Sequence, residues 1–205
     1  MPKDVAYLEP LRRRVRAVKD GQTLIDSQRV LLVHRPGRPP CYAFPESDVH
    51  EVPVQPEPDS PGYVTVEWGA VDSWFEEAEE VFGHPRNPYH RIDCLRAERR
   101  LVVEVGKSIL VDTNETLVVC ETSLAPRLYV EPRHVRRDLL EQSPTETYCP
   151  YKGTATYWSA RVGDEVVTDI AWSYEDPLPE SVPLRGFLSF DEARVILHHD
   201  LPLGD

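Results

Sequence analysis

The sequence predicts a mainly β fold made of two tandem compact β-sheet domains that are related by an internal repeat, with few short helices. Two observations predict it: short β-branched runs separated by Gly, Asp or Pro, and the recurrence of these runs in the same order along the chain. A chain of 205 residues is long enough for two small domains. We therefore expect a shortened N-terminal copy with a linking segment at residues 1–95 and a complete C-terminal copy at residues 96–205.

The first copy begins with runs that are typical of strands. Residues 15–18 lead through a turn at residues 19–21 into further runs at residues 23–27 and 30–33. A proline-rich segment follows at residues 52–61, and proline has no N–H to donate to a sheet ladder. We therefore expect a linker there, which makes this copy the shorter one.

The best candidate for a helix is residues 70–82. Apolar residues recur there at helical spacing, opposite a run of glutamates. Gly83 and Pro85 would end the helix. We expect its acidic side to be a solvated face.

The second copy repeats the runs of the first copy 86 residues later, so that Asp26 corresponds to Asp112. Farther along, residues 62–67 resemble residues 186–191, and the spacing there has grown to 124 residues. The second copy therefore carries an insertion of 38 residues, which we place at residues 145–183. Because only this copy has the insertion, we expect any ligand site to lie on it.

The insertion is predicted to be a β-hairpin. Residues 154–162 and 165–174 alternate on either side of Gly163 and Asp164, which suit a two-residue turn. One face of this hairpin is expected to be core, and its residues are Tyr151, Ala155, Tyr157, Ile170, Trp172 and Tyr174.

The other face supplies most of the candidate site. The predicted ligand-binding residues are Lys152, Trp158, Asp169, Glu175, Cys149 and Tyr151. The predicted register places Lys152 opposite Glu175 and Trp158 opposite Asp169. A lysine suits an anionic group, and an indole suits stacking on a flat ligand. The alternative is an ordinary solvated face, because cross-strand Lys and Glu pairs are common on sheets.

Cys149 has two interpretations. The nearby Lys152 would favour a reactive thiolate, whereas Pro150 and the neighbouring aromatic residues favour a buried structural cysteine. We favour the structural interpretation, and the sequence leaves the catalytic residues unknown. The spacing of His84 and His90, six residues apart, and the lack of a Cys-x-x-Cys pair predict no metal site, and no cofactor is predicted.

The composition favours a soluble cytoplasmic protein. A net charge of -12 argues against a nucleic-acid partner, which would need a concentrated basic face. No apolar segment approaches the roughly 20 residues of a membrane-spanning helix, so we expect no membrane partner. A small-molecule ligand is the expected partner, and the sequence does not indicate the oligomeric state.

Four motifs carry a resemblance to a known family: Trp74-Phe75-Glu76-Glu77, the segment from His84 to Asp93, Tyr148-Cys149-Pro150-Tyr151-Lys152-Gly153, and the segment from Trp172 to Glu180. In this order they resemble the domain of unknown function 427 family in its tandem form, from about residue 15 onward. The resemblance implies a compact, mostly β domain, often cytoplasmic and bacterial, without an established activity. It also brings a nucleotidyltransferase-like label.

The label implies a particular spacing of acidic residues. Two-metal enzymes hold their ions with closely spaced acidic residues. In nucleotidyltransferases these usually have Asp-x-Asp or Asp-x-Glu spacing, and neither spacing occurs in this sequence. Acidic residues that are distant in sequence can still converge in the fold.

Three functions remain as predictions. The first is binding of a small polar or anionic ligand by the C-terminal copy, with catalysis left open. The second is a noncatalytic protein-interaction module that uses exposed Trp68, Trp74 and Tyr63 of the shortened copy. The third is a nucleotidyltransferase-like activity, which only the family label suggests.

Overall fold

Antiparallel β-sheets account for most of the fold, which confirms the prediction of a mainly β protein with few short helices. The structure is a computed structural model that describes residues 6–163 and 165–201. The helices within these residues are short 3-10 helices: η1 (Glu46–Asp48), η2 (Trp68–Ala70), η3 (Pro132–His134), η4 (Arg137–Leu139) and η5 (Pro179–Leu184). In this described part of the chain, no helix has the length and apolar character needed to cross a membrane.

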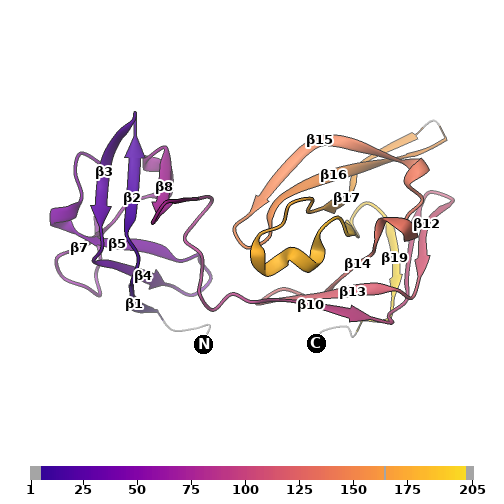
Figure 1. Ribbon diagram of the computed structural model, residues 1–205, viewed down its shortest axis with the longest axis horizontal. Coiled ribbons are helices and arrows are strands. Elements are labelled where there is room, and N and C mark those ends of the chain that lie inside the picture. The colour runs from indigo at the N-terminus through magenta and orange to yellow at the C-terminus, as the bar shows by residue number, and fades with distance from the viewer. Residues whose placement is uncertain (1–5, 164, 202–205) are drawn as a thin grey trace. The chain divides into compact units, whose positions relative to one another are not determined.

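The chain forms two compact units, Met1–Tyr89 and His90–Asp205. The first unit holds two antiparallel sheets (Figure 1). One has the order β1 (Tyr7–Leu11), β4 (Val30–His34), β5 (Cys41–Pro45), β7 (Tyr63–Thr65) and β6 (Gln55–Pro56). The other has the order β3 (Gln22–Ser27), β2 (Val15–Lys19), β8 (Ser73–Glu76) and β9 (Glu79–Val81). Alternate residues of both sheets point inward and form one core around Val15, Ile25 and Phe44.

The second unit holds three antiparallel sheets. The first has the order β10 (Ile92–Ala97), β13 (Thr116–Glu121) and β14 (Arg127–Tyr129). The second has the order β12 (Ser108–Thr113), β11 (Leu101–Val105) and β19 (Ile196–His199). The third has the order β15 (Leu140–Cys149), β16 (Gly153–Val162), β17 (Glu165–Ser173) and β18 (Leu188–Phe190). Buried residues of all three sheets pack into one cluster around Val103, Ile170 and Leu188.

The strand pairing of the first unit recurs in the second. Strand β4 pairs with β1 and β5, as β13 pairs with β10 and β14. The register also agrees: Leu31 lies opposite Ala43, and Leu117 lies opposite Tyr129, with each residue displaced by the same 86 positions. This displacement equals the spacing found between the repeated runs of the sequence.

The helix predicted at residues 70–82 is wrong, because this segment forms the hairpin of β8 and β9. Pairing of β8 with β2 gives the backbone hydrogen bonds that a helix would have supplied. Side chains then alternate with a period of two, so Trp74 and Glu76 are both buried while Phe75 lies between them on the other face. Glu76 was expected on a solvated face, but it accepts a hydrogen bond from the buried Tyr42 hydroxyl at 2.7 Å.

The same hairpin buries one of the three aromatic residues that the protein-interaction hypothesis names. Trp74 is 3% exposed, and its indole N–H donates to the carbonyl oxygen of Trp68 at 2.9 Å. Trp68 and Tyr63 are half-buried. Trp74 is therefore a core residue of the first unit, and Trp68 packs against that core.

The insertion contributes three strands rather than the two of a hairpin. Strand β15 was not predicted, and it pairs with β16 so that Cys149 lies opposite Gly153. The segment from Tyr148 to Gly153 is therefore the end of β15 and the tight turn into β16. The predicted runs at residues 154–162 and 165–174 are found as β16 and β17, while Asp164 of the predicted turn lies outside the described residues.

The predicted register of this hairpin is right near the turn and wrong beyond a bulge. Val162 lies opposite Glu165 as expected, but past the bulge Trp158 lies opposite Ala171 instead of Asp169. Asp169 has a left-handed φ of 53°, and its backbone N–H donates to the Ser159 hydroxyl at 3.1 Å. A bulge of this kind displaces all later pairs, which sequence alternation does not reveal.

Candidate functional site

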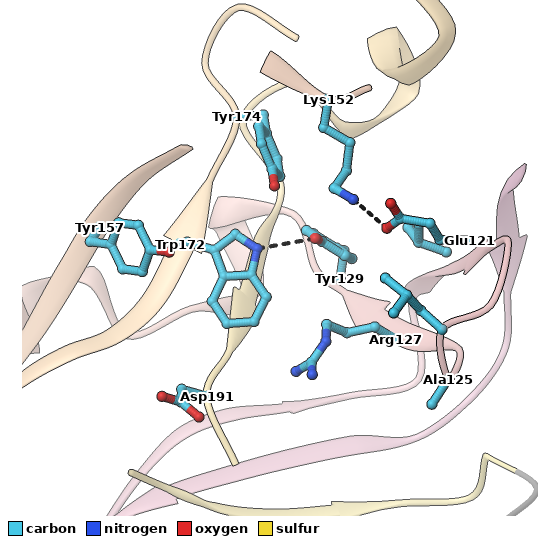
Figure 2. Close-up of a pocket in the computed structure, with 11 residues that line it drawn as sticks. Glu121, Ala125, Arg127, Tyr129, Lys152, Tyr157, Trp172, Tyr174 and Asp191 are labelled. Carbon is cyan, nitrogen blue, oxygen red and sulfur yellow. Dashed lines mark hydrogen bonds and ion pairs between the residues drawn. The ribbon is translucent and has the colours of Figure 1, made fainter. Parts of the chain in front are cut away.

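A cavity of about 500 Å³ lies in the C-terminal unit (Figure 2). Strands β13 and β14, the β15-β16 turn and strands β16 and β17 supply most of its lining. Its charged lining residues are Glu121, Arg127, Lys152 and Asp191. Its aromatic lining residues are Tyr129, Tyr157, Trp172 and Tyr174. An aromatic lining with a few placed polar groups is typical of small-molecule sites.

The aromatic side of the cavity is held by strand pairing and one hydrogen bond. Tyr157 of β16 lies opposite Trp172 of β17, and the Trp172 indole N–H donates to the Tyr129 hydroxyl oxygen at 3.1 Å. Burial raises the pKa of Tyr129 to about 12, and it also raises the pKa of Tyr174. Both hydroxyls are therefore neutral at physiological pH, and this wall carries no charge.

Lys152 belongs to a compact charge network at one end of the cavity. Its ammonium group pairs with the Glu121 carboxylate, whose other oxygen contacts His90 Nε2 at 2.9 Å. The His90 ring stacks on Tyr151, with 3.7 Å between ring centroids. Lys152 is 8% exposed, so the network is nearly sealed from solvent and its charges are balanced within it.

Arg127 is the cation of the cavity that lacks a carboxylate partner. Its guanidinium lies beside the Trp172 ring (Figure 2), 5.1 Å from the ring centroid. Its Nη1 donates to the carbonyl oxygen of Phe190 at 3.1 Å. Among the described residues, no carboxylate oxygen lies within 4.0 Å of its nitrogens. The lining acid Asp191 accepts instead from Arg194 at 3.1 Å. The cavity therefore presents a half-buried positive charge for which the described residues supply no carboxylate.

The six residues predicted from the sequence fall into two groups in the structure. Lys152 lines the cavity, and Tyr151 lies behind it against His90. Cys149 is half-buried and packs against the cluster that contains Tyr129.

The other three predicted residues lie outside the lining of the cavity. Trp158 donates its indole N–H to the Ser173 hydroxyl at 3.1 Å, and Ser173 in turn donates to Glu175 at 2.7 Å. Asp169 accepts a hydrogen bond from the Thr145 hydroxyl at 2.9 Å. Ser173 links Trp158 to Glu175, whereas Asp169 bonds Thr145 through Oδ2, and its buried Oδ1 has no hydrogen-bond partner among the described residues. None of the three contacts Lys152 in the described interactions.

Sequence reasoning missed Arg127 and the aromatic wall. Tyr157, Trp172 and Tyr174 were assigned to the core face, and that face lines the cavity. Arg127 could have been recognised as a candidate from the sequence, because it is a charged residue at the start of the apolar run of β14. It also replaces Cys41, which stands 86 residues earlier in the first copy.

The first unit has a cavity of about 620 Å³ at the corresponding position. Its lining includes Val33, Arg35 and Cys41, and the residues 86 positions later line the cavity of the C-terminal unit. Burial raises the pKa of the Cys41 thiol, which is therefore uncharged at neutral pH where the second copy has Arg127. Arg35 donates to both carboxylate oxygens of Glu57 at 2.9 and 2.8 Å.

Metal-binding chemistry finds little support in the side-chain arrangement. Within residues 6–163 and 165–201, no group of three or more His, Cys, Asp or Glu side chains is placed to hold a metal ion. The two lining acids, Glu121 and Asp191, each already have a cationic partner. Among the described residues, the fold therefore does not bring together the acidic pair that the nucleotidyltransferase-like label requires.

Comparison with known proteins gives one match. A family model described as a domain of unknown function, DUF427, matches residues 7–73 and 93–200. The match has two parts, one within each compact unit apart from the segment that joins them. No curated protein is found to match the chain.

Proposed function

Starting from a chain that belongs to the domain of unknown function 427 family, we propose that its C-terminal unit binds a small organic anion in the cavity around Arg127. The single observation that carries this proposal is the half-buried Arg127 guanidinium without a carboxylate partner among the described residues. Binding is the proposal, and no reaction is assigned to the site.

The proposal follows from the energetics of a partly desolvated charge. A buried ion is costly unless it is paired, and an anionic ligand would supply the missing partner. A guanidinium offers several N–H donors in a planar fork that matches carboxylate and phosphate oxygens. Within the described part of the chain, one donor of Arg127 is engaged, by the carbonyl oxygen of Phe190, so the fork has capacity for a ligand.

The rest of the lining suits the remainder of such a ligand. Trp172 and Tyr157 present flat apolar surface beside the cation, and neutral Tyr129 and Tyr174 add no repulsive charge. Lys152 adds a second cationic group, although Glu121 balances most of its charge. The first unit lacks the counterpart of Arg127, which is why we place the ligand in the second.

Binding can be measured by isothermal titration calorimetry with acetate, benzoate and inorganic phosphate as probes. We expect at least one of these anions to bind, and Arg127→Gln to weaken its binding about tenfold to a hundredfold, because a hydrogen bond to a charged group contributes about 1.5–3 kcal/mol. The matched control is Arg136→Gln, which removes an exposed arginine of the same unit that is paired with Asp138.

Two results would count against the proposal. One is the absence of binding by all three anions to the folded protein. The other is an equal loss of affinity in Arg127→Gln and Arg136→Gln, which would indicate a response to net charge rather than to the cavity.

A further inference from the structure

A second cavity of about 580 Å³ adjoins the first in the C-terminal unit. The two cavities share three lining residues, Leu124, Ala125 and Arg127. Beyond this shared edge the second cavity is lined largely by apolar side chains, among them Leu101, Leu128, Phe190, Leu197 and Leu201. The unit thus places a charged, aromatic cavity beside an apolar one.

Arg127 lies on the boundary between the two cavities. Its Nη1 donates to the carbonyl oxygen of Phe190, a residue that lines the second cavity, while its guanidinium stacks over Trp172, which lines the first. Leu124 stands on the shared rim and is 61% exposed. A ligand group bound to Arg127 is therefore next to apolar surface that is still open to solvent.

We infer that the ligand is an amphipathic anion, with its anionic head at Arg127 and an unbranched hydrocarbon chain in the second cavity. This inference rests on the proposed function and adds the chemical class of the ligand. Burial of apolar ligand surface against Leu128, Phe190 and Leu197 supplies the affinity that a lone charge contact lacks. The charge fixes the position and orientation of the head.

The test is a series of straight-chain carboxylates, from acetate to decanoate, each used below its micelle concentration. A buried methylene contributes about 0.8 kcal/mol, so Kd should fall about fourfold for each added methylene until the second cavity is full. Titration calorimetry on the full chain measures this slope.

Variants of the apolar lining distinguish binding of the hydrocarbon chain in this cavity from its adsorption to other apolar surface. Leu124→Ser and Leu197→Ser should flatten the dependence of Kd on chain length, and Leu197→Ser, whose residue lines only the second cavity, should leave acetate affinity unchanged. Leu124 is exposed and lies outside the buried cores, so its variant should fold. Ile109→Ser is the matched control, because Ile109 is an exposed apolar residue of the same unit that lines neither cavity.

The outcomes distinguish this inference from the proposed function. If acetate binds through Arg127 and longer chains bind no tighter, the anion site stands and the amphipathic ligand is excluded. If no acid of any length binds, the inference is overturned, and the proposed function is overturned with it when benzoate and phosphate also fail to bind. A chain-length dependence that Leu124→Ser and Ile109→Ser both retain, or that an alkylammonium series shares, would mean adsorption to apolar surface and would also overturn the inference.

Discussion

Glu121 is the residue on which the charge balance of the cavity depends. Its carboxylate is 11% exposed and contacts both the Lys152 ammonium group and the His90 ring. A carboxylate and an ammonium group at this depth stabilise the fold only as a pair, because either one alone would be a buried charge. Lys152 is therefore part of the folded structure of the site as well as part of its lining.

Replacement of Lys152 should destabilise the protein before it affects any ligand. We expect Lys152→Met to lower the free energy of unfolding by about 3 kcal/mol at neutral pH, because Glu121 would keep only His90 as a partner. Urea unfolding followed by tryptophan fluorescence measures the loss.

Two further variants make this prediction specific. Adding Glu121→Gln to Lys152→Met should recover part of the loss, because the uncompensated charge is removed. Arg161→Met breaks an exposed pair with Glu141 and should cause no comparable loss. Equal losses in Lys152→Met and Arg161→Met would show that burial of the Lys152 pair has no energetic effect.

At the scale of elements, the turn between β15 and β16 positions Lys152. Gly153 has a φ of +95°, which L-residues rarely adopt, and it begins β16 immediately after the lysine. A Cβ added at this position would lie 3.4 Å from the carbonyl oxygen of Asp176. This distance is an ordinary van der Waals contact, so the turn requires glycine for its backbone angle and not for lack of space.

We expect Gly153→Ala to lower the free energy of unfolding by about 2 kcal/mol, since strained backbone costs about 1–3 kcal/mol per residue. Gly163→Ala is the control: its φ of +64° lies near the left-handed helical minimum, and an added Cβ would meet nothing within 4 Å. Its loss should be about half as large. Thermal unfolding of the two variants compares them, and a Gly163→Ala loss that matches or exceeds the other would contradict the argument.

Most strands could be predicted from the sequence, and the failures have local causes. Strand β15 was not predicted, because Pro144 and a mixture of polar residues give it no apolar face. Its pairing with β16 is what makes it a strand. The segment from Ser73 to Glu76 was assigned to a helix because its apolar spacing fits both periods, and only its pairing with β2 decides between them.

The candidate site could be predicted only in part. Lys152 was found because it stands beside an unusual turn within the insertion, which is a feature of the sequence itself. Arg127 and Trp172 are 45 residues apart and meet only through the packing of β14 against β17, so no local pattern joins them. The grouping of Trp158 with Asp169 failed because the bulge at Asp169 changes the pairing beyond it.

At the scale of the whole molecule, buried tyrosines make the stability of both units depend on pH. Burial is the main cause of a raised pKa at Tyr42 in the first unit and at Tyr129 and Tyr174 in the second. An unfolded tyrosine has a pKa of about 10. Below that pH both states keep the proton, so these groups leave stability unchanged. Above it the unfolded chain loses protons first, and the folded state loses stability relative to it.

The free energy of unfolding should therefore be constant with respect to these groups up to about pH 10 and fall above it. For Tyr129, whose pKa is raised to about 12, the loss should be about 1.4 kcal/mol per pH unit between about pH 10 and 12. Tyr129→Phe should reduce the slope of unfolding free energy against pH by that amount. Denaturant unfolding across this range measures it, and an unchanged slope would show that Tyr129 ionises alike in both states.

The two copies hold ion pairs at corresponding positions, but the charges of the corresponding residues are reversed. This reversal restricts which segments could be exchanged between the copies. Arg35 of the first copy pairs with Glu57, whereas Glu121, 86 residues later, pairs with Lys152. A transplant of residues 117–131 into the place of residues 31–45 would set Glu121 against Glu57, whose side chain has no exposed surface. Two carboxylates would then share one buried position. The two segments are therefore not interchangeable at this position unless the charge of the partner residue is changed as well.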